Sequence, residues 1–193
     1  MQSAITKDSS VVPQPLQVDK LLQLIEQRLI LQHDVARWKW NHKRSIEAPQ
    51  REQELLAQLR EQAATYNLSP DAVSAFFQWQ IQAGKLIQIA DFQSWHKQGI
   101  QLFDNVPDLN LALRPLLDEL DVELLSALAE LTPVLGYSTT QELIESHAKK
   151  ILHGEGINET VRRVAIAPLL DVSDTPCQSN SSFFSDVRSL RSH

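Results

Sequence analysis

The sequence has little of what metal, phosphate and covalent chemistry require. Its single cysteine, Cys177, lies in a serine-rich stretch near the end and has no partner for an intrachain disulfide. The six histidines form no i, i+4 pair, no HExxH motif and no Cys/His cluster. The five glycines supply neither a phosphate-binding loop nor a nucleophile elbow. We therefore expect no metal and no covalent intermediate.

Long apolar runs are missing as well. No stretch approaches the roughly 20 apolar residues that span a bilayer, and the first residues lack the apolar core of a signal peptide. The net charge of −6 argues against a nucleic acid or an anionic membrane as partner. Any small anion would therefore have to be bound by a local cluster of cations.

Apolar residues instead recur at helical spacing through most of the chain, and no strand pattern competes with them. Ser69 and Pro70 are typical of a helix start, as N-cap and first helical residue. The pattern predicts helices over residues 16–43, 50–66, 70–97, 107–131, 139–152 and 158–167. Pro115 leaves open that the fourth of these starts or is kinked there. The prediction is an all-α fold in one domain, 1–193, with helices in 15–98 and 107–170 and an irregular tail in 171–193.

Three cations lie on helix faces that are otherwise apolar. Arg28 and Lys39 are eleven residues apart, almost three helical turns, so they share a face with leucines that a helix would bury. Arg51 opens the apolar stripe of the next helix. A cation on a buried face is costly unless a negative group meets it. Two interpretations stay open: a site for a small anion, or a structural ion-pair network with Glu26, Asp34, Glu52 or Glu54 as counter-ions.

The third predicted helix carries a strip of polar and small residues on its buried side, at Gln80, Gly84 and Gln88. A glycine inside a helix costs about 1 kcal/mol relative to alanine. We therefore expect another group to approach the backbone at Gly84.

A longer pattern runs through the first three predicted helices. It comprises Arg28, Asp34-Val35-Ala36, Lys39-Trp40, Ile46-Glu47, Arg51-Glu52, Phe77, Gln80-Ile81-Gln82-Ala83-Gly84-Lys85, Gln88, Phe92 and Trp95. Over residues 21–95 this pattern resembles the all-helical chorismate mutases, and most closely their secreted, or gamma, class. The second half resembles that class more loosely, through Pro107-Asp108-Leu109 and Arg114.

The resemblance implies a chorismate mutase type II-like helical bundle with one long N-terminal helix and a helical C-terminal extension. It implies an isomerase that converts chorismate to prephenate by a [3,3] rearrangement, in the shikimate pathway of aromatic amino acid biosynthesis. Residues 15–98 would form the mutase core, and 107–170 would complete the site. The family also implies a cofactor-free homodimer without feedback control, exported to the periplasm or secreted. A cytoplasmic location stays open.

The resemblance also assigns roles. Arg28 and Arg51 would bind substrate directly, Lys39 and Gln88 would contact the ether oxygen, and Glu52 would take the ring hydroxyl. Gly84, where relatives often carry Ser or Thr, would contact substrate only through its backbone. Arg114 would complete the site from within the same chain.

Two other functions stay open. Isochorismate–pyruvate lyases share the helical fold and the cationic contacts. A non-catalytic helical module that binds a ligand or a partner is the alternative from a different class, suggested by the long C-terminal half.

Overall fold

The computed structural model describes residues 15–170, and the regular secondary structure of this part is all helical, without a strand. The predictions for residues 1–14 and 171–193, including Cys177, lie outside the described residues. The long helices are α1 (Pro15–Asn41), α2 (Pro49–Ala63), α3 (Pro70–Gln98), α4 (Arg114–Leu131), α5 (Ser138–Ile151) and α6 (Glu159–Leu170). The short ones are η1 (Ala64–Tyr66), η2 (Leu109–Leu113) and η3 (Thr132–Val134). The all-α prediction is confirmed.

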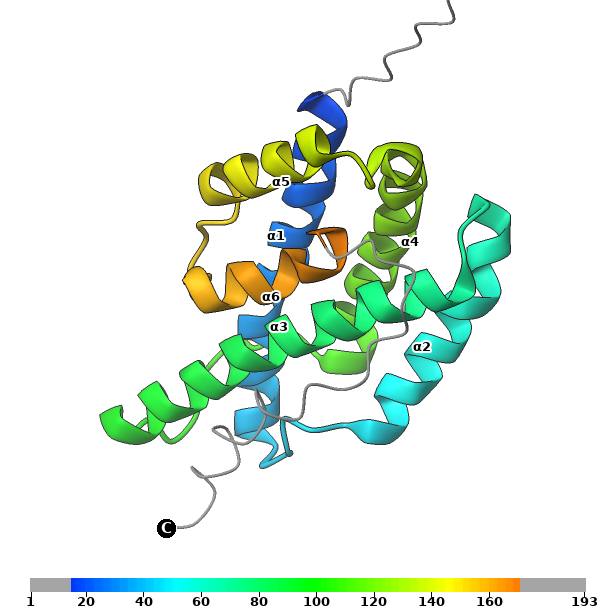
Figure 1. The fold of residues 1–193 in the computed structure, drawn as a ribbon. Coiled ribbons are helices and arrows are strands. Elements are labelled where there is room, and N and C mark those ends of the chain that lie inside the picture. Colours follow the sequence, from blue (N-terminus) through cyan, green and yellow to red (C-terminus); the bar gives the residue numbers. More distant parts are fainter. Residues whose placement is uncertain (1–14, 171–193) are drawn as a thin grey trace, which may run out of the picture.

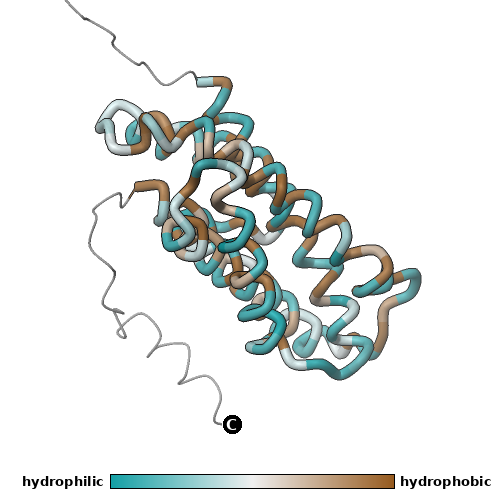
Figure 2. Tube along the Cα trace, turned by 90° about the vertical axis from the view of Figure 1, so that its right-hand side faces the viewer, coloured by the Kyte–Doolittle hydropathy of each residue, from teal (hydrophilic) through white to brown (hydrophobic). Residues whose placement is uncertain are grey.

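The helices are arranged around α1 and α3, which cross near the centre of the molecule (Figure 1). The helices α2 and α6 pack on α3, whereas α4 and α5 pack on α1. Polar and apolar residues alternate along each helix (Figure 2), as expected for helices that bury one face. The α1 face that the sequence predicted to be buried is buried, and its members Leu21, Leu24, Ile25 and Val35 are at most 5% exposed.

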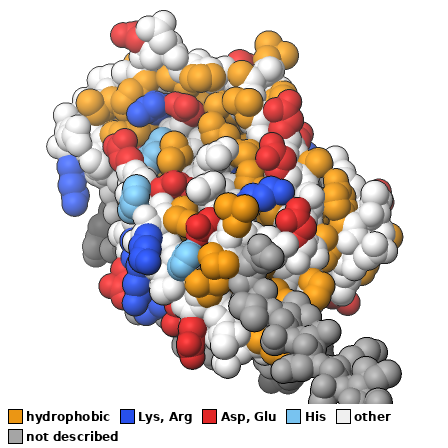
Figure 3. All heavy atoms as spheres, turned by 90° about the horizontal axis from the view of Figure 1, so that it is seen from above, with side chains coloured by type: hydrophobic (Ala, Val, Ile, Leu, Met, Phe, Trp, Pro, Cys, Tyr) orange, Lys and Arg blue, Asp and Glu red, His pale blue; other side chains and the backbone are white. Residues whose placement is uncertain are grey.

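On the face seen in Figure 3, acidic, basic and apolar side chains are interspersed over the described residues. Within residues 15–170, no helix is both long enough and apolar enough to cross a membrane.

The start of α4 lies at the second of two positions that the sequence left open, Pro107 and Pro115. After Pro107 the chain first makes a π-helical turn, η2, and α4 begins at Arg114. The Asp108 side chain caps this turn by accepting hydrogen bonds from the backbone N–H groups of Asn110 and Leu111, each at 2.8 Å. Pro115 then follows in the first turn of α4, where its missing N–H costs least. Leu116, also in this first turn, is 46% exposed.

An aromatic cluster holds the connection between α3 and η2 against α1. Trp95 of α3 contacts Trp40 of α1 edge-on, with ring centroids 5.6 Å apart, and Phe103 of the connection at 4.6 Å. The Asn41 side chain donates to the Phe103 carbonyl and accepts from its N–H. This cluster thereby fixes the path by which the chain reaches α4.

His33 ties three parts of the fold together. Its Nδ1 lies 2.7 Å from a carboxylate oxygen of Asp91 on α3, and its Nε2 lies 2.9 Å from the Glu155 carbonyl between α5 and α6. Both partners are acceptors, so both bonds form only when the imidazole carries two protons. The bond to Asp91 raises the pKa of His33, and this effect outweighs the lowering caused by burial.

His33 should therefore make the stability of the protein depend on pH. Its pKa is higher in the folded state, so its contribution is complete below the unfolded value of 6.5 and is lost as pH rises through the folded value. We expect His33→Gln to cost about 1.5–3 kcal/mol at pH 5.5 and less at pH 9, in urea unfolding. The exposed His96→Gln serves as control. A loss for His33→Gln that is the same at both pH values would contradict the charged state.

Candidate active site

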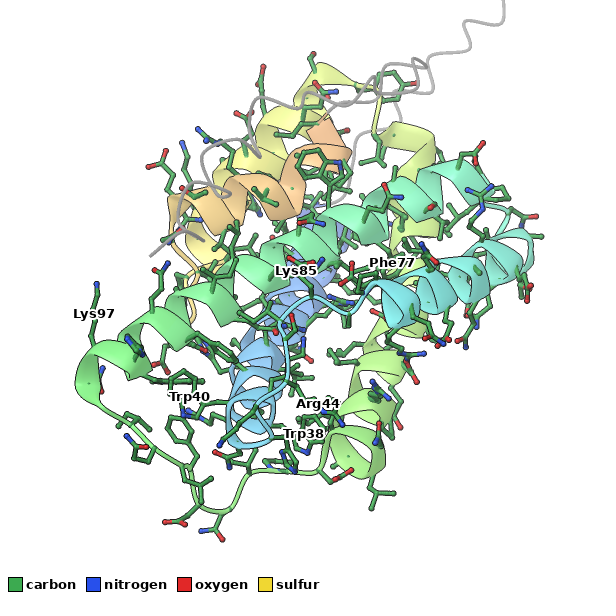
Figure 4. The ribbon with its side chains drawn as sticks, turned by 90° about the horizontal axis from the view of Figure 1, so that it is seen from below. Trp38, Trp40, Arg44, Phe77, Lys85 and Lys97 are labelled. Atoms are coloured by element: carbon green, nitrogen blue, oxygen red, sulfur yellow. The ribbon has the colours of Figure 1, made fainter. Side chains whose placement is uncertain are left out.

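One pocket collects side chains from α1, α2, α3 and α4. Its volume is about 130 Å³, and its floor and walls include Arg28, Lys39, Arg51, Glu52, Gln88 and Arg114. Six of the seven residues predicted for the site thus line one pocket, and Gly84 does not. In Figure 4, Lys85 lies among α1, α2 and α3, whereas Lys97 extends outward near the end of α3.

The charges of the lining side chains suit a dianion. Five of them are cations, Arg28, Lys39, Arg51, Lys85 and Arg114, and three are carboxylates, Glu52, Asp118 and Asp121. The wall therefore has a formal excess of two positive charges in a protein whose net charge is −6. Within the described residues, no group of three or more His, Cys, Asp or Glu side chains could hold a metal ion.

Lys39 is partly buried, near the C-terminal end of α1. Its Nζ donates to the Ile46 carbonyl at 2.7 Å and to the Gln88 side-chain oxygen at 3.0 Å. Burial lowers the pKa of Lys39 to about 8, with Glu52 acting in the opposite direction and Lys85 in the same direction. The ammonium therefore carries its charge at neutral pH while being largely shielded from water.

Gln88 is oriented by Gln32, a residue that sequence reasoning missed. The Gln88 amide nitrogen donates to the Gln32 side-chain oxygen at 2.8 Å, and the Gln32 nitrogen donates to the Arg28 carbonyl at 3.2 Å. The Gln88 oxygen is left for Lys39. An amide nitrogen has two hydrogens, so Gln88 keeps one donor for a ligand.

Gly84 makes room for this arrangement. A Cβ at position 84 would lie 3.0 Å from both Cγ and Cδ of Gln32. The group that approaches the α3 backbone, as the sequence led us to expect, is therefore the Gln32 side chain. Gln80, on the same strip, faces α6 instead and donates to the Ala165 carbonyl at 2.8 Å.

This contact gives a test of why α3 contains a glycine. In a Gln32→Ala background, Gly84→Ala should stabilise the protein by about 1 kcal/mol through helix propensity. With Gln32 present, the same change should give less or destabilise, because the new methyl group displaces the Gln32 amide. Urea unfolding of the four proteins measures the coupling. Effects that add to within about 0.5 kcal/mol would show that the two residues are independent.

Lys85 is held by two carboxylates. Its Nζ lies 2.7 Å from Glu47 and 2.8 Å from Glu52. Burial acts to lower the pKa of Lys85, but the bonds to Glu47 and Glu52 outweigh it and raise that pKa. Glu52 also accepts a hydrogen bond from the Ala48 backbone N–H at 3.1 Å, so it stands fixed at the start of α2.

The two arginines from α1 and α2 pair with carboxylates of α4. Arg28 donates through Nε to Asp121 at 2.7 Å, and both side chains are at most 5% exposed. Arg51 pairs with Asp118 at 3.3 Å, nearer the surface. No sequence signal available to us marked these partners, since they lie 93 and 67 residues away along the chain.

The four carboxylates considered as counter-ions form no direct ion pair with Arg28, Lys39 or Arg51 among the described residues. Glu26 accepts hydrogen bonds from the backbone N–H groups of His153 and Gly154, and Asp34 pairs with Arg37. Glu52 pairs with Lys85, and Glu54 accepts from Gln50. Glu52 still acts on Lys39 at longer range, because its charge raises the pKa of Lys39.

Arg114 comes to the pocket from the first residue of α4. The π-helical turn η2 precedes it, and its guanidinium donates to the side-chain oxygen of Asn110 in that turn at 2.5 Å. Of the C-terminal segment 107–170, η2 and α4 contribute lining residues, and α5 and α6 contribute none.

The comparisons with known proteins agree with this geometry. Residues 19–89 match the family model of chorismate mutase type II. These residues belong to the chorismate mutase type II family. The matched mutase region contains the pocket residues of α1, α2 and α3, whereas Arg114, Asp118 and Asp121 lie beyond it.

A curated relative extends the likeness into the second half. The secreted chorismate mutase of Mycobacterium tuberculosis (strain ATCC 25618 / H37Rv) is 32% identical over 110 residues, which cover 57% of this chain. The match spans about half the length of that relative, 55%.

Solved structures share the fold over most of the described chain. The chorismate mutase of Burkholderia thailandensis has a TM-score of 0.73 and 27% identity, covering 79% of this chain and 98% of that one. The secreted chorismate mutase of Yersinia pestis has a TM-score of 0.66 and 19% identity, covering 78% and 94%. The mutase region and the helices that follow it therefore form a fold of the chorismate mutase type II kind.

Proposed function

We propose that the protein is a chorismate mutase, an isomerase that rearranges chorismate to prephenate. The observation that carries the proposal is the convergence of cations from separate helices on one pocket with a formal excess of two positive charges. Chorismate is a dicarboxylate, so its charge complements this wall. The family of residues 19–89 and the names of the relatives support the same substrate.

The reaction suits the residues of the pocket. An ether C–O bond breaks while a C–C bond forms, without proton transfer or covalent intermediate. A protein accelerates such a step by holding a compact conformer and by stabilising negative charge on the ether oxygen. Lys39 and the free N–H of Gln88 would donate to that oxygen, because the two side chains are hydrogen-bonded to each other and both line the pocket.

The remaining predicted residues would bind the periphery of the substrate. Arg28, Arg51 and Arg114 would hold the carboxylates, since a guanidinium offers several donors in a fixed plane. Glu52, fixed by Lys85 and the Ala48 N–H, would accept the ring hydroxyl. Gly84 would act indirectly, by admitting Gln32 beside Gln88.

The decisive experiment is the loss of chorismate absorbance with purified protein, together with the appearance of prephenate. Isochorismate is assayed in parallel, because a lyase would release pyruvate from it. Turnover of chorismate alone supports the mutase. Pyruvate release from isochorismate would favour the lyase instead. The absence of both reactions, with no binding of a bicyclic dicarboxylate transition-state analogue, would favour a non-catalytic module.

The location, assembly and domain organisation are further parts of the proposal. Relatives named as secreted chorismate mutases support a secreted protein, and we extend this to the periplasm or the exterior. We also propose a homodimer of single-domain subunits, in which 15–98 and the first part of 107–170 build the site. Sedimentation equilibrium would test the dimer, and cell fractionation the location.

The pKa of Lys39 leads to a pH dependence. The ammonium is the active form, so kcat/KM should be maximal below about pH 8 and fall as pH rises through that value. The fall should approach about tenfold per pH unit. Initial rates between pH 6 and 10 measure it, with circular dichroism to confirm that the fold persists. A flat profile up to pH 10 would mean that the charge of Lys39 is not required.

A further inference from the structure

The ion pair between Arg28 and Asp121 is only half satisfied. Oδ1 of Asp121 accepts from Arg28 Nε at 2.7 Å, but Oδ2 has no hydrogen-bond partner among the described residues. The Asp121 side chain is 2% exposed, and the residue lines the pocket. A buried polar atom without a partner is costly, so its presence at a binding pocket calls for a role.

The surroundings of Asp121 act on its pKa in both directions. Burial raises the pKa of Asp121 and Asp118 adds to the effect, while Arg28, followed by Arg51, acts to lower it; the pKa is raised on balance. The charged groups of the pocket are Arg28 and Lys39 of α1, Arg51 and Glu52 of α2, Lys85 of α3, and Arg114 and Asp118 of α4.

A dicarboxylate in this pocket would add negative charge beside Asp121. Two carboxylates that share a site cannot both stay ionised at little cost, and one of them gains a proton. Small carboxylic acids of the substrate type are strong enough that the buried group is the one to be protonated. Protonation would free the charge of Arg28 for the ligand, and it would give Oδ2 a hydrogen to donate.

We propose that Asp121 is a positioning residue that holds Arg28 through Nε in the free protein and takes up a proton from solvent when a dicarboxylate binds. The geometry supports both halves. The Nε contact fixes the plane of the guanidinium and leaves the two Nη groups for the ligand. The unpartnered Oδ2 is the atom that receives the proton. The inference rests on the proposed function, because it requires a dicarboxylate ligand.

Calorimetry tests the proton uptake. A bicyclic dicarboxylate transition-state analogue is titrated into the full chain in buffers of different ionisation enthalpy, between pH 5 and 7, where Lys39 is already charged. The wild type should take up as much as about one proton per site at some pH in this range. Asp121→Asn keeps the shape of the side chain but cannot be protonated, so it should lose this uptake and still bind. Asp118→Asn, at the half-exposed carboxylate of the same helix, should still take up the proton but at a lower pH, because the charge of Asp118 raises the pKa of Asp121.

The outcomes separate the inference from the proposed function. Wild-type turnover of chorismate with equal proton uptake in wild type and Asp121→Asn would overturn the role of Asp121 and leave the function intact. If the wild type turns over chorismate but takes up no proton on binding the analogue, the role of Asp121 is likewise overturned and the function stands. A wild type that neither converts chorismate nor binds the analogue would overturn both. Where Asp121→Asn fails to fold, NMR of the wild type labelled with ¹³C at the aspartate carboxyls replaces it. One carboxyl signal should then move to the chemical shift of a protonated carboxyl when the analogue binds, and the absence of such a shift would overturn the inference.

Discussion

Replacing Lys39 with alanine should lower kcat for chorismate by about 10²- to 10³-fold, the usual loss when one donor to a developing oxyanion is removed. The ammonium is directed by the Ile46 carbonyl and the Gln88 oxygen, and both would remain in the variant. Alanine therefore removes the positive charge and leaves these two acceptors in place. The measurement is the steady-state rate at pH 7, below the Lys39 pKa of about 8.

Lys97→Ala is the matched control for Lys39→Ala, because Lys97 is an exposed lysine near the end of α3 (Figure 4). Its rate should equal that of the wild type. The Lys39 variant should keep its helical circular dichroism and its melting temperature to within a few degrees. Near-wild-type turnover by a folded Lys39→Ala protein would remove this residue from the mechanism.

Replacing Arg28 with alanine should affect both activity and stability. Turnover should fall by about 10²-fold or more, because a carboxylate-binding group is lost. The change also leaves the buried Asp121 carboxylate without its cation. Removing one partner of a buried ion pair lowers the free energy of unfolding by about 3–5 kcal/mol. Loss of the Arg28 charge should also raise the pKa of Asp121 further. The variant should therefore recover some stability at low pH, where the Asp121 carboxyl is protonated. Urea unfolding at pH 5 and pH 8 measures this.

A double replacement separates the two effects of Arg28. Arg28→Met combined with Asp121→Leu fills the same space with apolar groups, and such exchanges of a buried pair are often neutral or stabilising. The double variant should regain the stability lost in Arg28→Ala but none of the activity. Arg60→Ala, at an exposed ion pair with Asp71, is the control and should change neither property. Recovery of activity in the double variant would show that Arg28 serves the fold alone.

Local patterns predicted the helices well. The first predicted helix, 16–43, is observed as Pro15–Asn41, and the third, 70–97, as Pro70–Gln98. Both have long amphipathic faces, and Ser69 and Gly99 mark the two ends of α3 through a side-chain cap and a φ of +70°. For α4 the local pattern left two starts open, at Pro107 and at Pro115, and it did not predict the π-helical turn that Asp108 caps between them.

The candidate site was predictable where a chemical type was out of place on a helix face. Arg28 and Lys39 stood out as cations among leucines, and Gly84 as a glycine within a helix. Asp118 and Asp121 gave no such signal, since acidic residues on an amphipathic helix are ordinary. Gln32 was inconspicuous for the same reason. Their importance arises only from the packing of α4 on α1 and of α3 on α1, which no local pattern encodes.

The layer formed by α5 and α6 lies against α1 and α3, yet supplies no side chain to the pocket. The residues of this layer therefore affect the stability of the fold much more than the chemistry of the pocket. Substitutions in α5 and α6 that preserve packing can therefore accumulate, while the side chains that line the pocket stay the same. For protein engineering, this layer is the region to redesign when a longer-lived catalyst is wanted with unaltered selectivity.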